Sequence, residues 1–312
     1  MKQFAYPFLL ILLIAIMSCG NKPKPSQNKV NEEFPSEMVS FTPIKNNPVF
    51  IGTGSESWDK KIRERGFILF EDGQYKMWYT GYNDQLAKER FLGYATSSDG
   101  IHWEKYPYNP VFRKKWTEDM FVIKNEGTYY MYAEGEKDVA HWLSSPDGIH
   151  WEEQGDLIIQ STKGDTIPGP YGTPTVWIEN GKWYLFYERN DMGIWVATST
   201  NKGTWKNIQD DPVIKTGPDK YDTGAIAANQ VVKFNGRFYI YYHATDRLDW
   251  QHPSSPVFWS SNVAMSYDLI HWTKFPGNPI TKGNHSSPIL VFDGKKPCLY
   301  TMHSEVWRYN PQ

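Results

Sequence analysis

The sequence predicts an all-β protein: a five-bladed β-propeller of four-stranded antiparallel blades, closed by an N-terminal strand that completes the last blade. Fifty of the 312 residues are Phe, Trp or Tyr, and 45 are Gly or Pro. This composition is typical of many short strands joined by tight turns. One aromatic motif led by a glycine occurs five times along the chain, which indicates five copies of one structural unit.

The overall charge argues against nucleic acid as a partner. The chain has 33 Lys and Arg against 35 Asp and Glu, a formal net charge of −2. It therefore lacks the basic surplus that binding to a phosphate backbone requires. A hydrophobic content of 40% is too high for a disordered chain, so a sizeable packed core is expected.

The first 18 residues resemble a bacterial lipoprotein signal peptide. Lys2 precedes a short apolar run, residues 8–17, which is too short to cross a bilayer as a helix. Ser18 stands directly before Cys19, and a small residue there suits cleavage ahead of the cysteine and lipidation of its thiol. An ordinary secretory or anchor segment is the alternative interpretation.

The segment after the cleavage site is expected to connect an anchor to a folded domain. Residues 19–38 are rich in Lys, Pro, Asn and Ser, which is typical of a flexible tether. If Cys19 is lipidated, Cys298 has no disulfide partner. We expect the lipid to be the only membrane contact, and the protein to lie at the periplasmic face of the outer membrane.

The rest of the chain, residues 39–312, is expected to form one propeller domain made of five repeats. In each repeat a glycine is followed by an aromatic strand, and the glycines are separated by 54, 54, 55 and 58 residues. A second motif, Ser-x-Asp-Gly-Ile-His-Trp or a close variant, follows in four of the repeats. The repeat glycines are Gly73, Gly127, Gly181, Gly236 and Gly294, and the motif tryptophans are Trp103, Trp151, Trp205 and Trp272.

The ends of the repeat predict how the ring closes. A Pro-Val-Phe-like element follows most repeats, but the fifth repeat ends near Asn310 without it, whereas residues 47–50 supply an extra copy before the first repeat. About 50 residues and four strands per unit are typical of a propeller blade. A β-sandwich or a two-domain arrangement would leave both the repeat and its offset unexplained.

Blade geometry predicts which residues meet at one mouth of the central channel. The innermost strand runs from the mouth to the repeat glycine and the next strand runs back, so the residue seven after the glycine returns to the mouth. Polar residues that differ between otherwise similar repeats are expected to form the site there. The return positions are Thr80, Glu134, Glu188, His243 and Thr301, and the entry positions include Glu64, Arg65, Asp119, Gly172, Thr173 and His285.

The acids before the inner strands and the pattern Gly-x-Tyr-Tyr-Leu-x-Tyr resemble the five-bladed propeller glycoside hydrolases of families 43 and 117, and more distantly families 32, 62, 68 and 130. The resemblance implies three acids: a general base, an acid that tunes pKa and position, and a general acid. Asp119 matches the second, and Glu64 falls near the first. The third position departs from family 43, because Gly172 stands where that family has the glutamate of Glu-Gly-Pro.

Glu188 is our candidate for the missing proton donor, because it returns to the same mouth in the same blade. Glycosidic hydrolysis needs one acid to protonate the leaving oxygen and one carboxylate to activate water or attack carbon. The propeller relatives mostly invert, so the two carboxyls are expected roughly 6.5–9.5 Å apart. Asp59 is the competing base, and Glu134 and Asp222 are the competing acids.

Each candidate catalytic acid also has a purely structural interpretation. Asp119 is then a turn residue, Glu188 forms an ion pair with an arginine, and Glu64 is an exposed surface charge. Further residues are predicted to bind substrate. His102, His150 and His271 belong to the repeated turn motif and are expected to be scaffold. The predicted substrate-binding residues are Asp59, Arg65, Glu134, Arg189, Asp222, His243 and His285.

No cofactor is required by this chemistry, and no metal-ligand spacing is present in the sequence. The resemblance to family 43 implies that a structural calcium or sodium ion would lie in the central channel. An insertion, residues 248–258, is expected to restrict the pocket and make the enzyme exo-acting.

We therefore expect a glycosidase whose partner is an oligosaccharide, and which releases a terminal furanose or anhydro sugar. A glycoside phosphorylase and a non-catalytic glycan-binding propeller are the alternatives.

Overall fold

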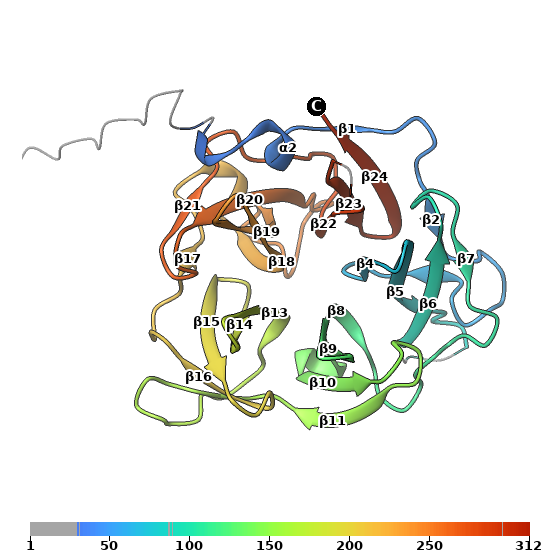
Figure 1. The fold of residues 1–312 in the computed structure, drawn as a ribbon, viewed down its shortest axis with the longest axis horizontal. Helices are drawn as coiled ribbons and strands as arrows, with labels where there is room; N and C mark the ends of the chain where they lie inside the picture. Colours follow the sequence, from blue (N-terminus) through green and yellow to red (C-terminus); the bar gives the residue numbers. More distant parts are fainter. Residues whose placement is uncertain (1–29, 31, 87, 89, 295) are drawn as a thin grey trace, which may run out of the picture.

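The computed structural model describes residues 30, 32–86, 88, 90–294 and 296–312. Five small antiparallel sheets surround a central axis, which confirms the predicted five-bladed β-propeller (Figure 1). The predicted signal peptide, the lipidated Cys19 and the first part of the predicted tether lie outside the described residues. Among the helices of the described part, none has the length and apolar character needed to cross a bilayer.

Each blade follows the strand order expected from its repeat. The first blade contains β3 (Lys61–Ile62), β4 (Phe67–Glu71), β5 (Gln74–Tyr82), β6 (Phe91–Ser97) and β7 (Glu104–Lys105). The second contains β8 (Glu118–Asn125), β9 (Thr128–Glu134), β10 (Ala140–Ser145) and β11 (Glu152–Asp156). The third contains β13 (Gly172–Glu179), β14 (Lys182–Glu188), β15 (Gly193–Ser199) and β16 (Thr204–Asn207), with the short β12 (Ile158–Gln160) and β17 (Ile214–Lys215) at its edge.

The last two blades follow the same plan. The fourth contains β18 (Ala225–Phe234), β19 (Arg237–Thr245), β20 (Ser260–Ser266) and β21 (Trp272–Lys274). The fifth contains β22 (Pro288–Val291), β23 (Cys298–Met302) and β24 (Glu305–Pro311), to which β1 (Phe41–Pro43) and β2 (Phe50–Ile51) add. The described residues also include the short helix α2 (Ser36–Val39) and two single 3₁₀ turns, η1 (Glu136–Asp138) and η2 (Lys220–Asp222).

The amino-terminal strands close the ring, as the offset of the repeat predicted. Phe50 pairs with Val306 of β24, and Phe41 pairs with Pro311 farther along the same strand. Figure 1 shows β1 and β2, in blue, beside the dark red β24. The first strand, β1, lies upstream of the predicted segment at residues 47–50, so two short strands rather than one complete the last blade.

The end of the segment expected to be a tether, up to residue 38, packs on the propeller. Phe34 and Met38 are buried in a cluster with Tyr239 and Leu299. The Tyr241 hydroxyl donates a 2.7 Å hydrogen bond to the Met38 carbonyl. Burial of these two apolar side chains stabilises the docked segment, and it also covers apolar side chains of the blades.

The repeated histidine motif forms turns on the outside of the blades. In the first blade the Asp99 carboxylate accepts hydrogen bonds from the backbone of Ile101 and His102 and contacts the His102 ring. Asp147 and Asp268 make the same contacts with the matching residues of their own blades. The three histidines are exposed, with side-chain exposures of 79–85%, so they lie apart from the central channel.

The inner strands begin at the channel mouth with a recurrent irregularity. Pairing joins Glu118 to Glu134 and Gly172 to Glu188, and the register then shifts within the next three residues of each inner strand. A bulge of this kind redirects side chains at the end of a strand. The residues with left-handed backbone at this place are Arg65, Asp119, Thr173 and Ser287, at φ values of 46–58°. Four blades thus adopt an unfavourable backbone conformation at one mouth, as is common at functional sites.

The docking of the amino-terminal segment predicts a stability effect. Met38→Ala removes a fully buried side chain and should lower the free energy of unfolding by about 2–5 kcal/mol in a denaturant titration. Met192→Ala is the matched control, because Met192 is 55% exposed and its loss should change little. Equal stability of the two variants would show that the segment does not pack on the propeller.

Candidate active site

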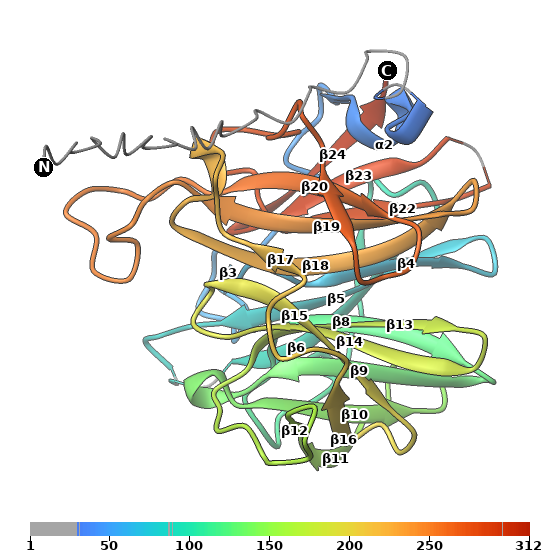
Figure 2. The same ribbon diagram turned by 90° about the vertical axis from the view of Figure 1, so that its left-hand side faces the viewer.

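A cavity of about 220 Å³ opens at the mouth where the inner strands begin, and all five blades contribute to it. Figure 2 shows the loop between β19 and β20, in orange, extending from the same side of the molecule as β3. The lining residues are Arg63, Glu64, Asp119, Glu134, Asp138, Pro170, Thr173, Glu188, Asn190, Asp191, His243, Trp250, Gln251, Trp259, Ser286 and Ser287.

The structure brings the three predicted catalytic acids to this one cavity. Glu64 precedes β4, Asp119 lies at the start of β8, and Glu188 ends β14. Glu134 and His243, both predicted to bind substrate, line it as well. The rule that places the seventh residue after each repeat glycine at the mouth thus located Glu134, Glu188 and His243 correctly.

Glu64 is held as a carboxylate. Its Oε2 lies 2.9 Å from Nδ1 of His303, and its Oε1 lies 3.7 Å from Nη2 of Arg63. Burial alone would raise the pKa of Glu64, but the His303 contact and the charge of Arg63 lower it to about 2. Glu64 is therefore ionised at any pH at which a protein of this kind works.

The pKa of Glu188 is shifted in the opposite direction. Its side chain is buried, and burial together with the nearby charge of Asp138 raises the pKa of Glu188 to about 7. A hydrogen bond from the Asp191 backbone N–H to Oε2 and the charge of Arg65 limit this rise. At neutral pH a large fraction of Glu188 is protonated, which is the state that a proton donor needs.

The glycine that replaces the family 43 acid leaves room for Glu188. A Cβ atom built on Gly172 would lie 1.7 Å from Oε1 of Glu188 and 3.0 Å from Oε1 of Glu134. The Glu188 carboxyl therefore fills the space in which a side chain at position 172 would begin. An acid at position 188 therefore requires that position 172 has no side chain.

Asp119 and Glu134 complete the acidic wall. Burial and neighbouring carboxylates raise the pKa of both groups well above the ordinary values. Glu134 also accepts a hydrogen bond from the backbone N–H of Thr173. Both side chains are almost completely buried, and the raised pKa values favour the protonated forms, which can donate hydrogen bonds.

Arg65 lies beneath these acids and is almost fully buried. Its Nη2 lies 3.5 Å from the Thr175 hydroxyl, and its charge acts on Glu64, Asp119, Glu134 and Glu188. It does not line the cavity, so it supports the acids from below instead of contacting a ligand. The calcium or sodium ion expected in the central channel stays a prediction.

A tighter acidic cluster lies on the wall of the second blade. Ligand atoms of Glu118, Glu134 and Asp138 lie within 4.8 Å of one another. Nε of Arg63 already contacts Oε2 of Glu118 at 2.7 Å. The positive charge that this cluster requires therefore comes at least partly from the protein itself.

Two predicted ligand-binding acids are instead structural. The Asp59 carboxylate accepts hydrogen bonds from Lys105 at 2.7 Å and from the Tyr79 hydroxyl at 3.1 Å. Asp222 is completely buried and pairs with Lys274. Neither acid lines the cavity, because the ion pairs turn both carboxylates toward lysines of their own blades.

Arg189 and His285 also lie outside the cavity lining. The Arg189 guanidinium lies 5.5 Å from the ring centre of Trp195. The His285 ring packs on Trp307 with a centroid distance of 4.2 Å. The spacing from the repeat glycine predicts where the main chain of these residues lies. It does not predict in which direction their side chains point.

The sequence analysis missed several residues of the site. Asp138 and Asp191 come from turns just after β9 and β14, and Asp191 has a positive φ of 53°. His303 lies two residues beyond the return position Thr301, which was the one available signal for it. The insertion at 248–258 does shape the site, since Trp250 and Gln251 line the cavity.

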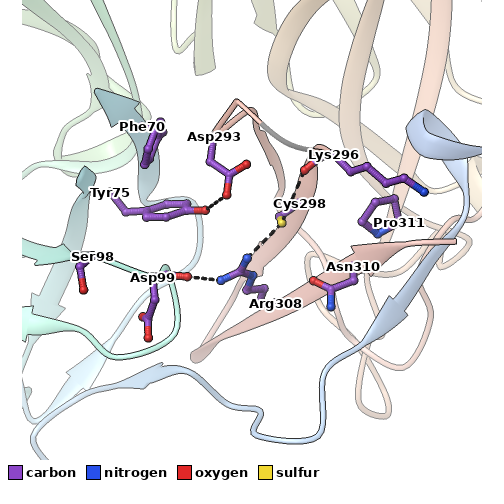
Figure 3. Close-up of a pocket in the computed structure, with 10 residues that line it drawn as sticks. All are labelled: Phe70, Tyr75, Ser98, Asp99, Asp293, Lys296, Cys298, Arg308, Asn310 and Pro311. Carbon is purple, nitrogen blue, oxygen red and sulfur yellow. Dashed lines mark hydrogen bonds between the residues drawn. The ribbon is translucent and has the colours of Figure 1, made fainter. Parts of the chain in front are cut away.

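A second cavity, of about 470 Å³, lies at the outer edge between the first and fifth blades (Figure 3). Arg308 spans it, with Nη2 3.2 Å from Sγ of Cys298 and Nη1 donating to the Asp99 carbonyl. The Tyr75 hydroxyl donates to Asp293 at 2.6 Å. Cys298 forms no disulfide among the described residues. These contacts join neighbouring blades and include no set of acids like that at the mouth.

Comparisons with known proteins find glycan-processing enzymes among the proteins similar to this chain, although no family model matches it. It is 22% identical over 231 residues to a 1,2-beta-oligomannan phosphorylase of Thermoanaerobacter sp., covering 67% of this chain and 73% of that protein. It is 26% identical over 181 residues to a beta-1,2-mannobiose phosphorylase of the same organism, covering 51% and 58%. The chain thus spans less than two thirds of this second relative.

Solved structures share the fold over most of the chain. A glycosyl hydrolase from Bacteroides ovatus has a TM-score of 0.65 at 16% identity, covering 88% of this chain and 95% of that one. A beta-1,2-mannobiose phosphorylase from Listeria innocua has a TM-score of 0.65 at 14% identity, covering 87% and 96%. The chain is therefore similar to the five-bladed propeller glycoside hydrolases and to the mannoside phosphorylases of family 130.

The packing of Glu188 against Gly172 predicts an asymmetric effect of two glycine substitutions. Gly172→Ala would place a methyl group on the Glu188 carboxyl, so the carboxyl must move and the free energy of unfolding should fall by about 1–3 kcal/mol. Gly169→Ala is the control, because its nearest contact would be an ordinary 3.6 Å. Equal unfolding midpoints in a denaturant titration would contradict the close packing.

Proposed function

We propose that this chain is a glycoside hydrolase that releases a terminal sugar from an oligosaccharide. The observation that carries the proposal is one cavity lined both by Glu64, which contacts His303 and Arg63, and by the buried Glu188, with the pKa of Glu64 lowered and that of Glu188 raised. Two carboxyl groups held in opposite protonation states are what acid–base cleavage of a glycosidic bond requires.

Each acid then has a defined part in the reaction. The Glu64 carboxylate accepts a proton from water as that water attacks the anomeric carbon. Glu188 donates its proton to the leaving oxygen as the glycosidic bond breaks. Glu64 ends the reaction protonated and Glu188 ionised, and proton exchange with solvent restores both. Asp119, which is buried and has a raised pKa, would hydrogen-bond to the sugar and is the second candidate for proton donor.

The identity of the sugar is suggested by the relatives. The names of the Thermoanaerobacter and Listeria proteins specify β-1,2-linked mannosides, so we place β-mannosides first and the furanose and anhydro sugars expected from the sequence second. Trp250 and Trp259 pack edge to face at 5.6 Å on the rim of the cavity. We infer that this pair closes one end of the site and makes cleavage exo-acting.

Phosphorolysis is the second candidate, because several relatives are phosphorylases. A phosphate ion needs a cluster of cationic side chains. Among the residues that line the cavity, Arg63 is the one Lys or Arg, and it already pairs with Glu118 and Glu64. An acidic wall without spare cations favours water over phosphate as the acceptor.

We further infer from the sequence alone that Cys19 is lipidated and that the propeller lies at the periplasmic face of the outer membrane. An enzyme held there would meet oligosaccharides that enter the periplasm.

A panel of oligosaccharides incubated with and without inorganic phosphate tests the proposal. Wild type should release a free sugar, with no sugar phosphate in either condition, as seen by anion-exchange chromatography. Glu188→Gln and Glu64→Gln should each lose about 10²–10⁴-fold in rate, whereas Glu152→Gln, on an exposed strand position, should not. Phosphate-dependent product would establish a phosphorylase, and binding without turnover would establish a glycan-binding module.

A further inference from the structure

His303 and Glu64 are in contact across the junction between the fifth and first blades, and this contact is not part of the predicted site. We propose that His303 is a positioning residue, which orients the Glu64 carboxylate and keeps it ionised for its part as the base. The inference rests on the hydrolase function proposed above, and it adds a residue that does not itself line the cavity.

The geometry gives Glu64 two different partners. Its Oε2 lies 2.9 Å from Nδ1 of His303, whereas its Oε1 lies at the longer distance of 3.7 Å from Arg63. His303 is fixed in turn by its own backbone, because its N–H donates a 3.1 Å hydrogen bond to the Glu305 carbonyl in the turn between β23 and β24. This bond holds the backbone of His303 in that turn.

The other charged groups around Glu64 are engaged elsewhere. Arg63 lies closer to Glu118, at 2.7 Å, than to Glu64. Arg65 acts most strongly on Asp119. Each of these arginines therefore mainly balances another acid.

His243, from the fourth blade, also does not supply a positive charge to Glu64. Burial lowers the pKa of His243 to about 3, so its ring is neutral over the working range. Its Nδ1 lies 3.2 Å from the Asn229 side chain. Of the charged and titratable groups that face Glu64, namely Arg63, Arg65, Glu118, Asp119, His243 and His303, His303 alone makes a short contact with it.

Partial burial makes the contact effective. The side chains of His303 and Glu64 are 27% and 30% exposed, so the pair is better shielded from solvent than an ordinary surface ion pair. Without His303, burial and the neighbouring acids Glu118 and Asp119 would favour the protonated form of Glu64. A protonated Glu64 cannot accept a proton from water.

The consequence for pH dependence has a definite sign. In the wild type, kcat/KM should stay level from about pH 6 down to the limit of stability, because the pKa of Glu64 is near 2. It should fall above about pH 7, as Glu188 loses its proton. In His303→Ala the pKa of Glu64 should rise, so activity should fall several-fold between about pH 6 and pH 4, where wild type stays level.

The pH profiles of four proteins test this: wild type, His303→Ala, His303→Asn and His102→Ala. His303→Asn keeps an N–H donor but lacks the imidazole, and should show a weaker acidic limb. His102 is exposed on an outer turn, and its variant should match wild type. All four should share the alkaline limb, because that limb belongs to Glu188.

Loss of rate in His303→Ala without a new acidic limb would overturn the inference and leave His303 a structural residue. A wild type without hydrolytic activity would instead overturn the proposed function. If His303→Ala does not fold, the carbon-13 signal of the Glu64 carboxyl in wild type, assigned with Glu64→Gln, decides the matter. No titration above about pH 3.5 supports the contact, and a midpoint near 4.5 contradicts it.

Discussion

The site depends on an imbalance of buried charge around Arg65. One buried guanidinium faces the carboxyls of Glu64, Asp119, Glu134 and Glu188, and it cannot stabilise all of them as anions. Burial and mutual repulsion therefore favour the protonated form of some of these acids, while Glu64 stays ionised because His303 contacts it. The division into a base and an acid thus follows from where the cations lie, since the acids themselves are chemically alike.

The propeller supplies the precision that this division needs. Inner strands from different blades converge on one mouth, and a left-handed residue or a register shift lies near the start of each of them. The ring must also be closed, because His303 from the fifth blade contacts Glu64 from the first. Pairing of β1 and β2 with β24 provides that closure and so stabilises the junction on which the base depends.

The repeat in the sequence predicted the topology because every blade needs the same tight turn at its glycine and the same buried aromatic strand after it. It also located Glu134, Glu188 and His243, because strand pairing fixes which residues return to the mouth. It misjudged Asp59 and Asp222, whose carboxylates turn toward lysines in a way that depends on tertiary packing. It missed Asp191 and His303 because they lie in turns that the repeat does not specify.

The central claim is that Glu64 is the base and Glu188 the proton donor, and the dependence on leaving group tests it most directly. A dinitrophenyl glycoside of the sugar that the wild type releases needs no protonation of its leaving group. The account predicts that Glu188→Gln hydrolyses this substrate at nearly the wild-type rate while remaining inactive on the oligosaccharide, and that Glu64→Gln is inactive on both. Rescue of Glu64→Gln, or equal loss by Glu188→Gln on both substrates, would contradict it.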